Sequence, residues 1–414
     1  MVIMSNWFVM SILLALSVAG FYFGRAKAVA KSDRQARRLK SLPVYYGYFV
    51  ALWCGLPSLM LFLAWSIWER QLVDNGAVST EYRYAAIAAI LSLSVAGLAF
   101  GHNRVRPQMH ARRLFERVVR TLLALCSLVA IVTTVGIILS LVVESIRFFN
   151  LVSPMEFLFG LEWSPQTALR ADQVGSDGSF GAVPLLAGTV MVSIIAMCVA
   201  GPVGLLAAIY MSEYASPKTR AVVKPVLEVL AGIPTVVYGF FAAITMAPFF
   251  RDLGEGFGLD VSSESALAAG VVMGIMIIPF VSSLSDDVIR AVPQSLREGS
   301  LSLGATQSET IRKVVLAAAL PGIVSSFLLA VSRAIGETMI VVMAAGLAAK
   351  LSANPLEAMT TVTVQIVTLL VGDQEFDSAK TLAAFALGLL LFFLTLILNV
   401  ISMIVVNRYR EQYD

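Results

Sequence analysis

Arg333 and Glu337 are the charged side chains best placed to do chemistry, because both lie in a long apolar run, 322–349, that is predicted to cross a membrane. A helix that begins near Ile323 and rises ~1.5 Å per residue reaches Arg333 after about 15 Å, half of a hydrocarbon core roughly 30 Å thick. An arginine at that depth costs about 2.5–3.5 kcal/mol to insert and normally faces a partner or a polar path.

Two other polar residues are predicted to share the helix face of Arg333. Glu337 follows it by one turn and Ser326 precedes it by two turns. A guanidinium offers five donors in a planar fork that suits an oxyanion, and it keeps its charge. We therefore expect Arg333, Glu337 and Ser326 to line a translocation path for an anion. The alternative is an ion pair between Arg333 and Glu337 that only locks helices together.

A polar segment, 295–321, precedes this apolar run and has an acidic residue, two small residues and a glycine at a defined spacing. The segment is compatible with helix on both sides of the glycine, which tolerates backbone angles that other residues resist. We predict a short surface helix that ends in a hinge; the alternative is an ordinary amphipathic loop between two spans. The four residues are Glu298, Gly299, Ser300 and Gly304.

A third group of residues, Gly232, Pro234 and Gly239, interrupts the apolar run 223–250. Such breaks are tolerated within a membrane only where neighbouring groups or a cavity satisfy the backbone. The pattern predicts a kinked helix, which either lines a pathway or only improves packing.

Composition places the chain among polytopic membrane proteins, since 58% of its residues are hydrophobic and 14% are charged. The sequence has no G-x-x-x-x-G-K-[ST] loop and no Ser/His/Asp or Cys/His arrangement, so we expect neither enzymatic activity nor a cofactor. Its three cysteines lie in apolar runs and its two histidines have no partners at ligand spacing, which predicts no metal site. The sequence has no basic tail for nucleic acid.

Continuous apolar runs predict nine transmembrane helices and an all-α fold. With the amino terminus outside, the cytoplasmic segments hold 22 of the 30 Lys and Arg residues and the opposite segments hold 7, as the positive-inside rule requires. This orientation places 285–320 in the cytoplasm and the long loop 144–182 outside. The predicted spans are about 7–24, 43–68, 84–100, 121–143, 183–211, 223–250, 265–284, 322–349 and 381–406.

The sequence divides near residue 120. Residues 1–120 form an amino-terminal membrane extension of three spans with two strongly basic loops, for which we consider both contact with anionic membrane lipid and simple topology-setting. Residues 121–414 hold the other six spans.

The polar segment resembles the cytoplasmic loop of binding-protein-dependent ABC importer permeases. Glu298 and Gly304 stand at the spacing of the family motif E-A-A-x-x-x-G, with Gly299 and Ser300 in place of its alanines. Three further stretches are similar to the phosphate-specific, PstC-type permeases, and the resemblance covers most of 121–414. They are SRAIGET at 332–338, FGLEWSP at 159–165 and FGAVPLLAGT at 180–189.

The resemblance implies a six-span type I importer permease core, with 186–406 as its ABC permease region and 285–320 as the loop that couples to an ATPase. It implies a multi-pass protein of the bacterial inner membrane that forms half of an ATP-driven phosphate path. The implied partners are a homologous second permease subunit (PstA type), a dimer of ATP-binding subunits (PstB type) and a periplasmic phosphate-binding protein (PstS type).

Three alternatives stay open at this point. An arginine in the path would equally suit sulfate or molybdate. A secondary transporter would need intramembrane carboxylates and usually has paired repeats, and neither is evident beyond Glu337. A regulatory membrane subunit is the third alternative.

Overall fold

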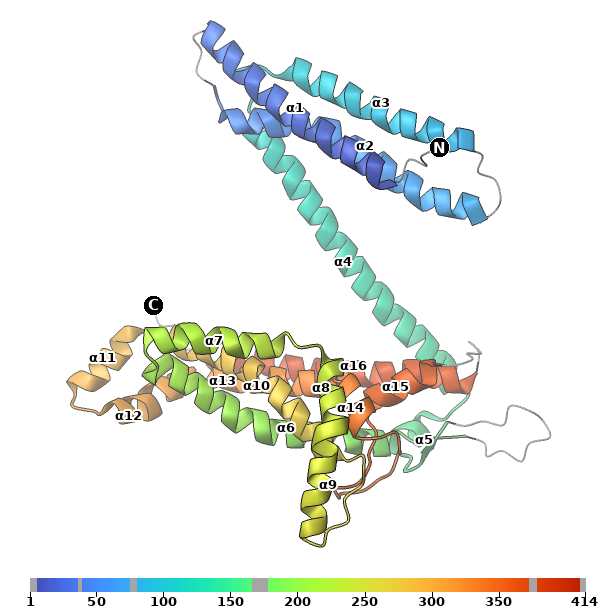
Figure 1. Cartoon of the computed structure of the whole chain (residues 1–414), viewed down its shortest axis with the longest axis vertical. Helices are drawn as coiled ribbons and strands as arrows, with labels where there is room; N and C mark the ends of the chain where they lie inside the picture. The colour runs from blue at the N-terminus through green and yellow to red at the C-terminus, as the bar shows by residue number, and fades with distance from the viewer. Residues whose placement is uncertain (1–5, 36–38, 75–79, 166–177, 372–377, 410–414) are drawn as a thin grey trace, which may run out of the picture. The chain divides into compact units, whose positions relative to one another are not determined.

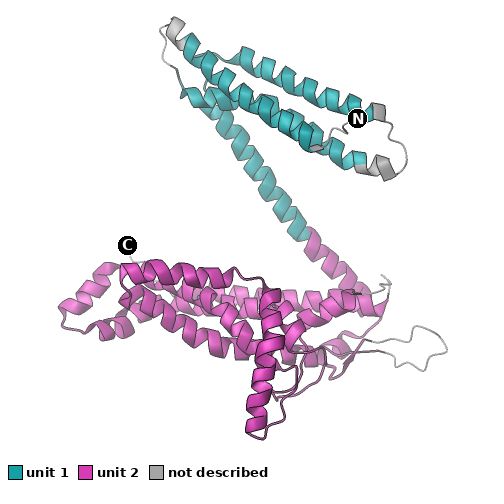
Figure 2. Cartoon of the chain, in the orientation of Figure 1, with its two compact units in different colours: residues 1–135 teal, residues 136–414 magenta. Residues whose placement is uncertain are grey.

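The structure, a computed structural model, describes residues 6–35, 39–74, 80–165, 178–371 and 378–409. It forms two compact units, Met1–Val135 and Gly136–Asp414, which are coloured separately in Figure 2 and shown with their helices in Figure 1. The helix α4 (Ala111–Phe149) contributes residues to both units. The domain boundary expected at residue 120 stays a prediction.

The first unit is built on three helices that lie side by side (Figure 1): α1 (Asn6–Gln35), α2 (Pro43–Asp74) and α3 (Thr80–Arg104). Glycines allow this close approach, because a Cβ added at Gly97 would lie 2.0 Å from the Trp53 carbonyl oxygen. Small residues at such crossings are typical of helix packing in membranes.

The start of α4 belongs to the same unit and is fixed by aromatic contacts. The ring of Phe115 stacks on that of Tyr48, with centroids 4.9 Å apart. The buried Tyr46 hydroxyl lies 2.9 Å from the carbonyl oxygens of Pro107 and Met109, in the turn before α4. These contacts hold the start of α4 against α2.

The second unit contains the remaining elements, and two of its long helices, α6 and α10, pack along each other. A Cβ added at Gly270 would lie 2.7 Å from Ile195, and one at Gly274 would lie 2.8 Å from the Ala196 carbonyl oxygen. The elements in order are α5 (Pro154–Phe159), β1 (Trp163–Ser164), β2 (Ser179–Phe180), α6 (Val183–Ile209), η1 (Tyr210–Tyr214), α7 (Pro217–Ala231), α8 (Thr235–Phe241), η2 (Ala242–Met246), α9 (Ala247–Gly256), α10 (Ala266–Ala291), α11 (Gln294–Ser302), α12 (Gln307–Thr310), η3 (Ile311–Val315), α13 (Leu316–Ile335), α14 (Met339–Ala344), α15 (Val362–Leu370) and α16 (Ala379–Tyr409).

Nine helices within the described residues are long and apolar enough to cross a membrane, which confirms the predicted all-α polytopic fold. Two of the nine predicted ranges were wrong. The sixth span is Thr235–Gly256 and not 223–250, because the chain breaks at Gly232 and α7 is a separate helix.

The eighth span is Gln307–Ile335 and not 322–349. It begins early because Thr306 and Glu309 form a capping box, in which the Thr306 hydroxyl accepts from the Glu309 amide and the Glu309 carboxylate accepts from the Thr306 amide. It ends early because the chain breaks at Gly336 and α14 starts three residues later. Apolar content alone gave no indication of either limit.

The long loop 144–182, which is predicted to lie outside, contains a short antiparallel hairpin in which Trp163 pairs with Phe180. The indole Nε1 of Trp163 donates to the side-chain oxygen of Gln365 in α15, at 2.9 Å. Residues 166–177 of this predicted loop lie outside the described part of the chain.

Candidate functional site

Arg333 is exposed and lies in the last turn of α13, two residues before the span Gln307–Ile335 ends, so its expected place at the middle of the span was wrong. Its guanidinium carbon lies 5.5 Å from the centroid of the Phe280 ring of α10, a cation–π contact. No carboxylate among the described residues lies within ion-pair distance of this guanidinium. Arg333 is therefore a cation held by a ring, with its donors available to an incoming anion.

The prediction that Glu337 shares a helix face with Arg333 was wrong. Helix α13 ends at Ile335, so the two residues do not stand one turn apart on a continuous helix. One Glu337 carboxylate oxygen accepts from the amide of Met339 at 3.1 Å and lies 3.5 Å from that of Ile340. Glu337 thus satisfies amides that the first turn of α14 leaves without partners.

The backbone of Glu337 is held as well, because the Thr363 hydroxyl donates to its carbonyl oxygen at 2.8 Å. This bond ties the connection between α13 and α14 to the start of α15. Glu337 therefore has a local structural role that the sequence pattern did not indicate.

Ser326 is buried, with 3% of its surface exposed. Its hydroxyl donates to the carbonyl oxygen of Gly322, one turn earlier, at 2.9 Å. The structure does not bring Ser326 onto an exposed face with Arg333, and its role in a path stays a prediction.

The predicted kink at Gly232 and Pro234 is a complete break between α7 and α8, and α8 and α9 run across the direction of α6 (Figure 1). The Gly232 amide ends α7 by donating to the carbonyls of its last turn. The Tyr238 hydroxyl crosses the break and donates to the Leu230 carbonyl oxygen at 2.9 Å. These bonds satisfy backbone groups that the break would otherwise leave unpaired.

Gly239 brings α8 against α14. A Cβ added there would lie 2.9 Å from the sulfur of Met343 and 3.0 Å from the Met339 carbonyl oxygen. Gly239 therefore allows α8 to pack closely against α14, the helix whose first amides bind Glu337.

The polar segment forms α11, a turn at Gly304 and the start of the eighth span. Gly304 has φ +85°, a conformation that favours glycine. The Ser300 and Thr310 hydroxyl oxygens lie 2.9 Å apart and close the turn. Glu298 and Gly299 are exposed on α11, and a Cβ at Gly299 would meet nothing within 4 Å.

Both ends of this turn are held by η1, which follows α6. The Arg297 guanidinium in α11 donates to the Glu213 carboxylate at 3.0 Å, and the Gln307 side chain donates to the Glu213 carbonyl oxygen at 3.0 Å. Leu303 stays 91% exposed at the tip. Sequence reasoning missed this leucine, although an apolar residue in a polar loop was a visible signal.

A buried acid at the end of α10 was also missed. Asp286 is fully buried, and one of its carboxylate oxygens accepts from Arg220 at 2.6 Å and from Lys224 at 3.3 Å. Both cations come from α7, which has no buried residue of its own. The ion pairs therefore fasten α7 to α10, and the sequence signal was two adjacent acids, Asp286 and Asp287, at the end of an apolar run.

In the loop 350–361, on the opposite side of the predicted membrane, neighbouring side chains change the pKa of an acid, Glu357. The pKa of the Glu357 carboxyl is lowered, chiefly by its hydrogen bond from Lys350, with a further contribution from Asn354. In the described part of the chain, no group of three or more His, Cys, Asp or Glu side chains could hold a metal ion.

Two family models match the sequence. The "Binding-protein-dependent transport system inner membrane component" model matches residues 200–411, and the "Phosphate ATP-binding cassette transporter" model matches residues 10–92. The first match includes α11, Arg333 and Glu337. The second lies within the predicted amino-terminal extension.

Three relatives align over most of their own length. The probable ABC transporter permease protein YqgH of Bacillus subtilis is 36% identical, covering 68% of this chain and 87% of the relative. The phosphate transport system permease protein PstC 1 of Mycobacterium tuberculosis is 34% identical, covering 61% and 82%. The PstC of Haemophilus influenzae is 29% identical, covering 70% and 92%.

Proposed function

The chain belongs to the inner membrane components of binding-protein-dependent transport systems, and from this premise we propose that it is the permease subunit of an ATP-driven phosphate importer. The observation that carries the proposal is the double match, in which 200–411 fit the permease model and 10–92 fit a phosphate ATP-binding cassette transporter model. The PstC relatives support the same substrate.

The partners follow from this assignment. An ABC importer permease works with an ATPase and a binding protein, and we propose a PstB-type ATPase dimer, a PstS-type binding protein and a PstA-type second permease. Helix α11 is the proposed contact for the ATPase, because its tip exposes Leu303 while Arg297 fixes the helix to Glu213. A push on α11 would therefore be transmitted to the end of α6.

The proposed anion path is centred on Arg333. Its exposed guanidinium has no carboxylate partner in the described residues and rests on Phe280. Glu337 supports the site indirectly by ordering the start of α14, and Gly239 allows α8 to reach α14. We keep Ser326 as a residue that the path would use only after α13 moves, since its hydroxyl now bonds to Gly322.

The experiment is reconstitution of the chain with its co-purifying subunits in lipid vesicles, with the binding protein added outside. We expect ATP-dependent uptake of labelled phosphate that excess sulfate or molybdate does not compete away. If sulfate or molybdate strongly inhibits this uptake, that oxyanion becomes the proposed substrate in place of phosphate. Uptake driven by an ion gradient without an ATPase would overturn the importer assignment.

A further inference from the structure

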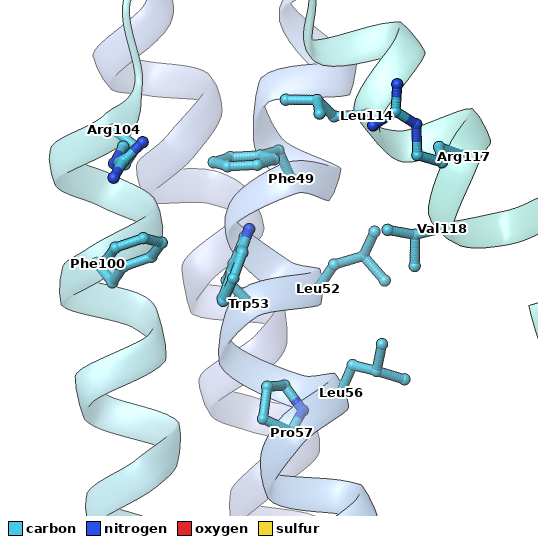
Figure 3. Close-up of a pocket in the computed structure, with 10 residues that line it drawn as sticks. All are labelled: Phe49, Leu52, Trp53, Leu56, Pro57, Phe100, Arg104, Leu114, Arg117 and Val118. Atoms are coloured by element: carbon cyan, nitrogen blue, oxygen red, sulfur yellow. The ribbon is translucent and has the colours of Figure 1, made fainter. Parts of the chain in front are cut away.

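The first unit contains an apolar groove of about 480 Å³ between α2, α3 and the first turns of α4 (Figure 3). This volume lies within the range of about 300–1,000 Å³ that is typical of small-molecule sites. Leu52, Trp53 and Leu56 of α2 line it between Phe100 of α3 and Val118 of α4. The Trp53 and Phe100 rings are packed, with centroids 4.8 Å apart.

The groove is polar at one end. Arg104 of α3 and Arg117 of α4 lie there, whereas Leu56 and Pro57 lie at the opposite end (Figure 3). The Arg104 guanidinium carbon lies 5.1 Å from the Phe100 ring centroid, and neither arginine has an ion-pair partner among the described residues. The nearby Glu116 carboxylate is already paired with Arg112 at 2.6 Å.

Two further cations bind the backbone at the end of α3 that carries Arg104. Lys27 and Lys31 of α1 donate to the carbonyl oxygens of His102 and Val105, at the end of α3. Their ammonium groups lie beside the backbone that carries Arg104. The end of the groove is therefore strongly electropositive.

We propose that this groove binds one anionic phospholipid of the cytoplasmic leaflet, with its phosphate between Arg104 and Arg117 and an acyl chain along Trp53 toward Pro57. The charge distribution of the sequence places 101–120 on the cytoplasmic side. A basic pocket above an apolar channel complements a lipid that is negative at one end and apolar along its length. Such a lipid would be a ligand of the amino-terminal extension, separate from the transported anion.

The test measures contact between lipid and Trp53. The full chain, purified with whichever subunits stay bound, is placed in phosphatidylcholine vesicles that contain an equal fraction of either brominated phosphatidylglycerol or brominated phosphatidylcholine. Bromine quenches a tryptophan that it touches. We expect stronger quenching by brominated phosphatidylglycerol, and Trp53→Phe should remove this excess.

Charge variants separate a specific site from general attraction. Arg104→Gln with Arg117→Gln should lower relative affinity for phosphatidylglycerol about fivefold per arginine, whereas Arg104→Lys with Arg117→Lys should retain most of it. The matched control, Arg106→Gln with Arg113→Gln, removes two charges that do not line the groove and should leave the excess quenching intact.

Three outcomes would overturn the proposal. Equal quenching by both brominated lipids would mean that only unselective lipid contacts Trp53. An equal loss in the control pair would assign the preference to net surface charge. Excess quenching in the isolated chain that disappears in the assembled transporter would show that a protein helix covers the groove. None of these outcomes depends on phosphate uptake.

Discussion

A carboxylate oxygen of Glu337 accepts a hydrogen bond from the amide of Met339 at 3.1 Å. Through this bond Glu337 contacts the start of α14, whereas the Arg333 guanidinium contacts the ring of Phe280. The two charged residues of the predicted path therefore have separate partners. Their substitutions should act independently, which an ion pair would not allow.

Arg333→Gln should reduce phosphate uptake by roughly tenfold or more, because a charge-assisted hydrogen bond contributes about 1.5–3 kcal/mol. Glu337→Gln should retain most uptake, since its amide oxygen still accepts from Met339. Uptake by whole cells, normalised to protein in the membrane, measures both effects. Arg408→Gln, which removes an exposed charge in the last turn of α16, outside the proposed path and the coupling segment, is the control. Near-normal uptake by Arg333→Gln would contradict the anion path.

Asp286→Ala should lower the free energy of unfolding by about 3–5 kcal/mol, the usual effect of breaking a buried ion pair. Arg220 and Lys224 would lose the acid that holds α7. The neighbouring Asp287 is the control, because its side chain is 65% exposed and Asp287→Ala should change little. Unfolding of the purified chain in detergent gives the comparison, and equal effects of the two substitutions would argue against the fastening role.

Gly304→Val should reduce transport and the stimulation of ATPase activity, because φ +85° is strained for a β-branched residue. Gly299→Ala is the matched control in the same loop. It adds a methyl group where nothing lies within 4 Å and should stabilise α11 by about 0.5–1 kcal/mol. Full activity of the valine variant at normal expression would mean that the turn has no coupling role.

A cysteine at Leu303 should be labelled by membrane-impermeant reagents only after cells are opened, since this exposed tip is predicted to be cytoplasmic. A cysteine at Leu161, which is 63% exposed in the predicted outer loop, should be labelled in intact cells. The background needs Cys126 and Cys198 replaced, because both are exposed. Labelling of the Leu303 cysteine in intact cells would reverse the topology and exclude the ATPase contact.

The sequence determined the class of fold, because apolar runs of membrane-spanning length and the asymmetry of Lys and Arg depend only on local composition. It also determined the turn at Gly304. A glycine between two helix-compatible segments indicates a positive-φ backbone conformation that other residues rarely adopt. Nine spans were predictable for the same reason, although Thr235–Gly256 and Gln307–Ile335 differ from their predicted ranges.

Only the tertiary structure decided the partners of the charged residues. Spacing placed Glu337 one turn after Arg333, but α13 ends at Ile335, between the two residues, and the Glu337 carboxylate accepts from an amide of α14. Spacing likewise gave no partner for Asp286. Its cations come from α7, and one of them, Arg220, is 66 positions away in the sequence. An ion pair or a helix cap between distant segments depends on how the chain folds back on itself. The local sequence pattern contains no information about which segments that folding brings together.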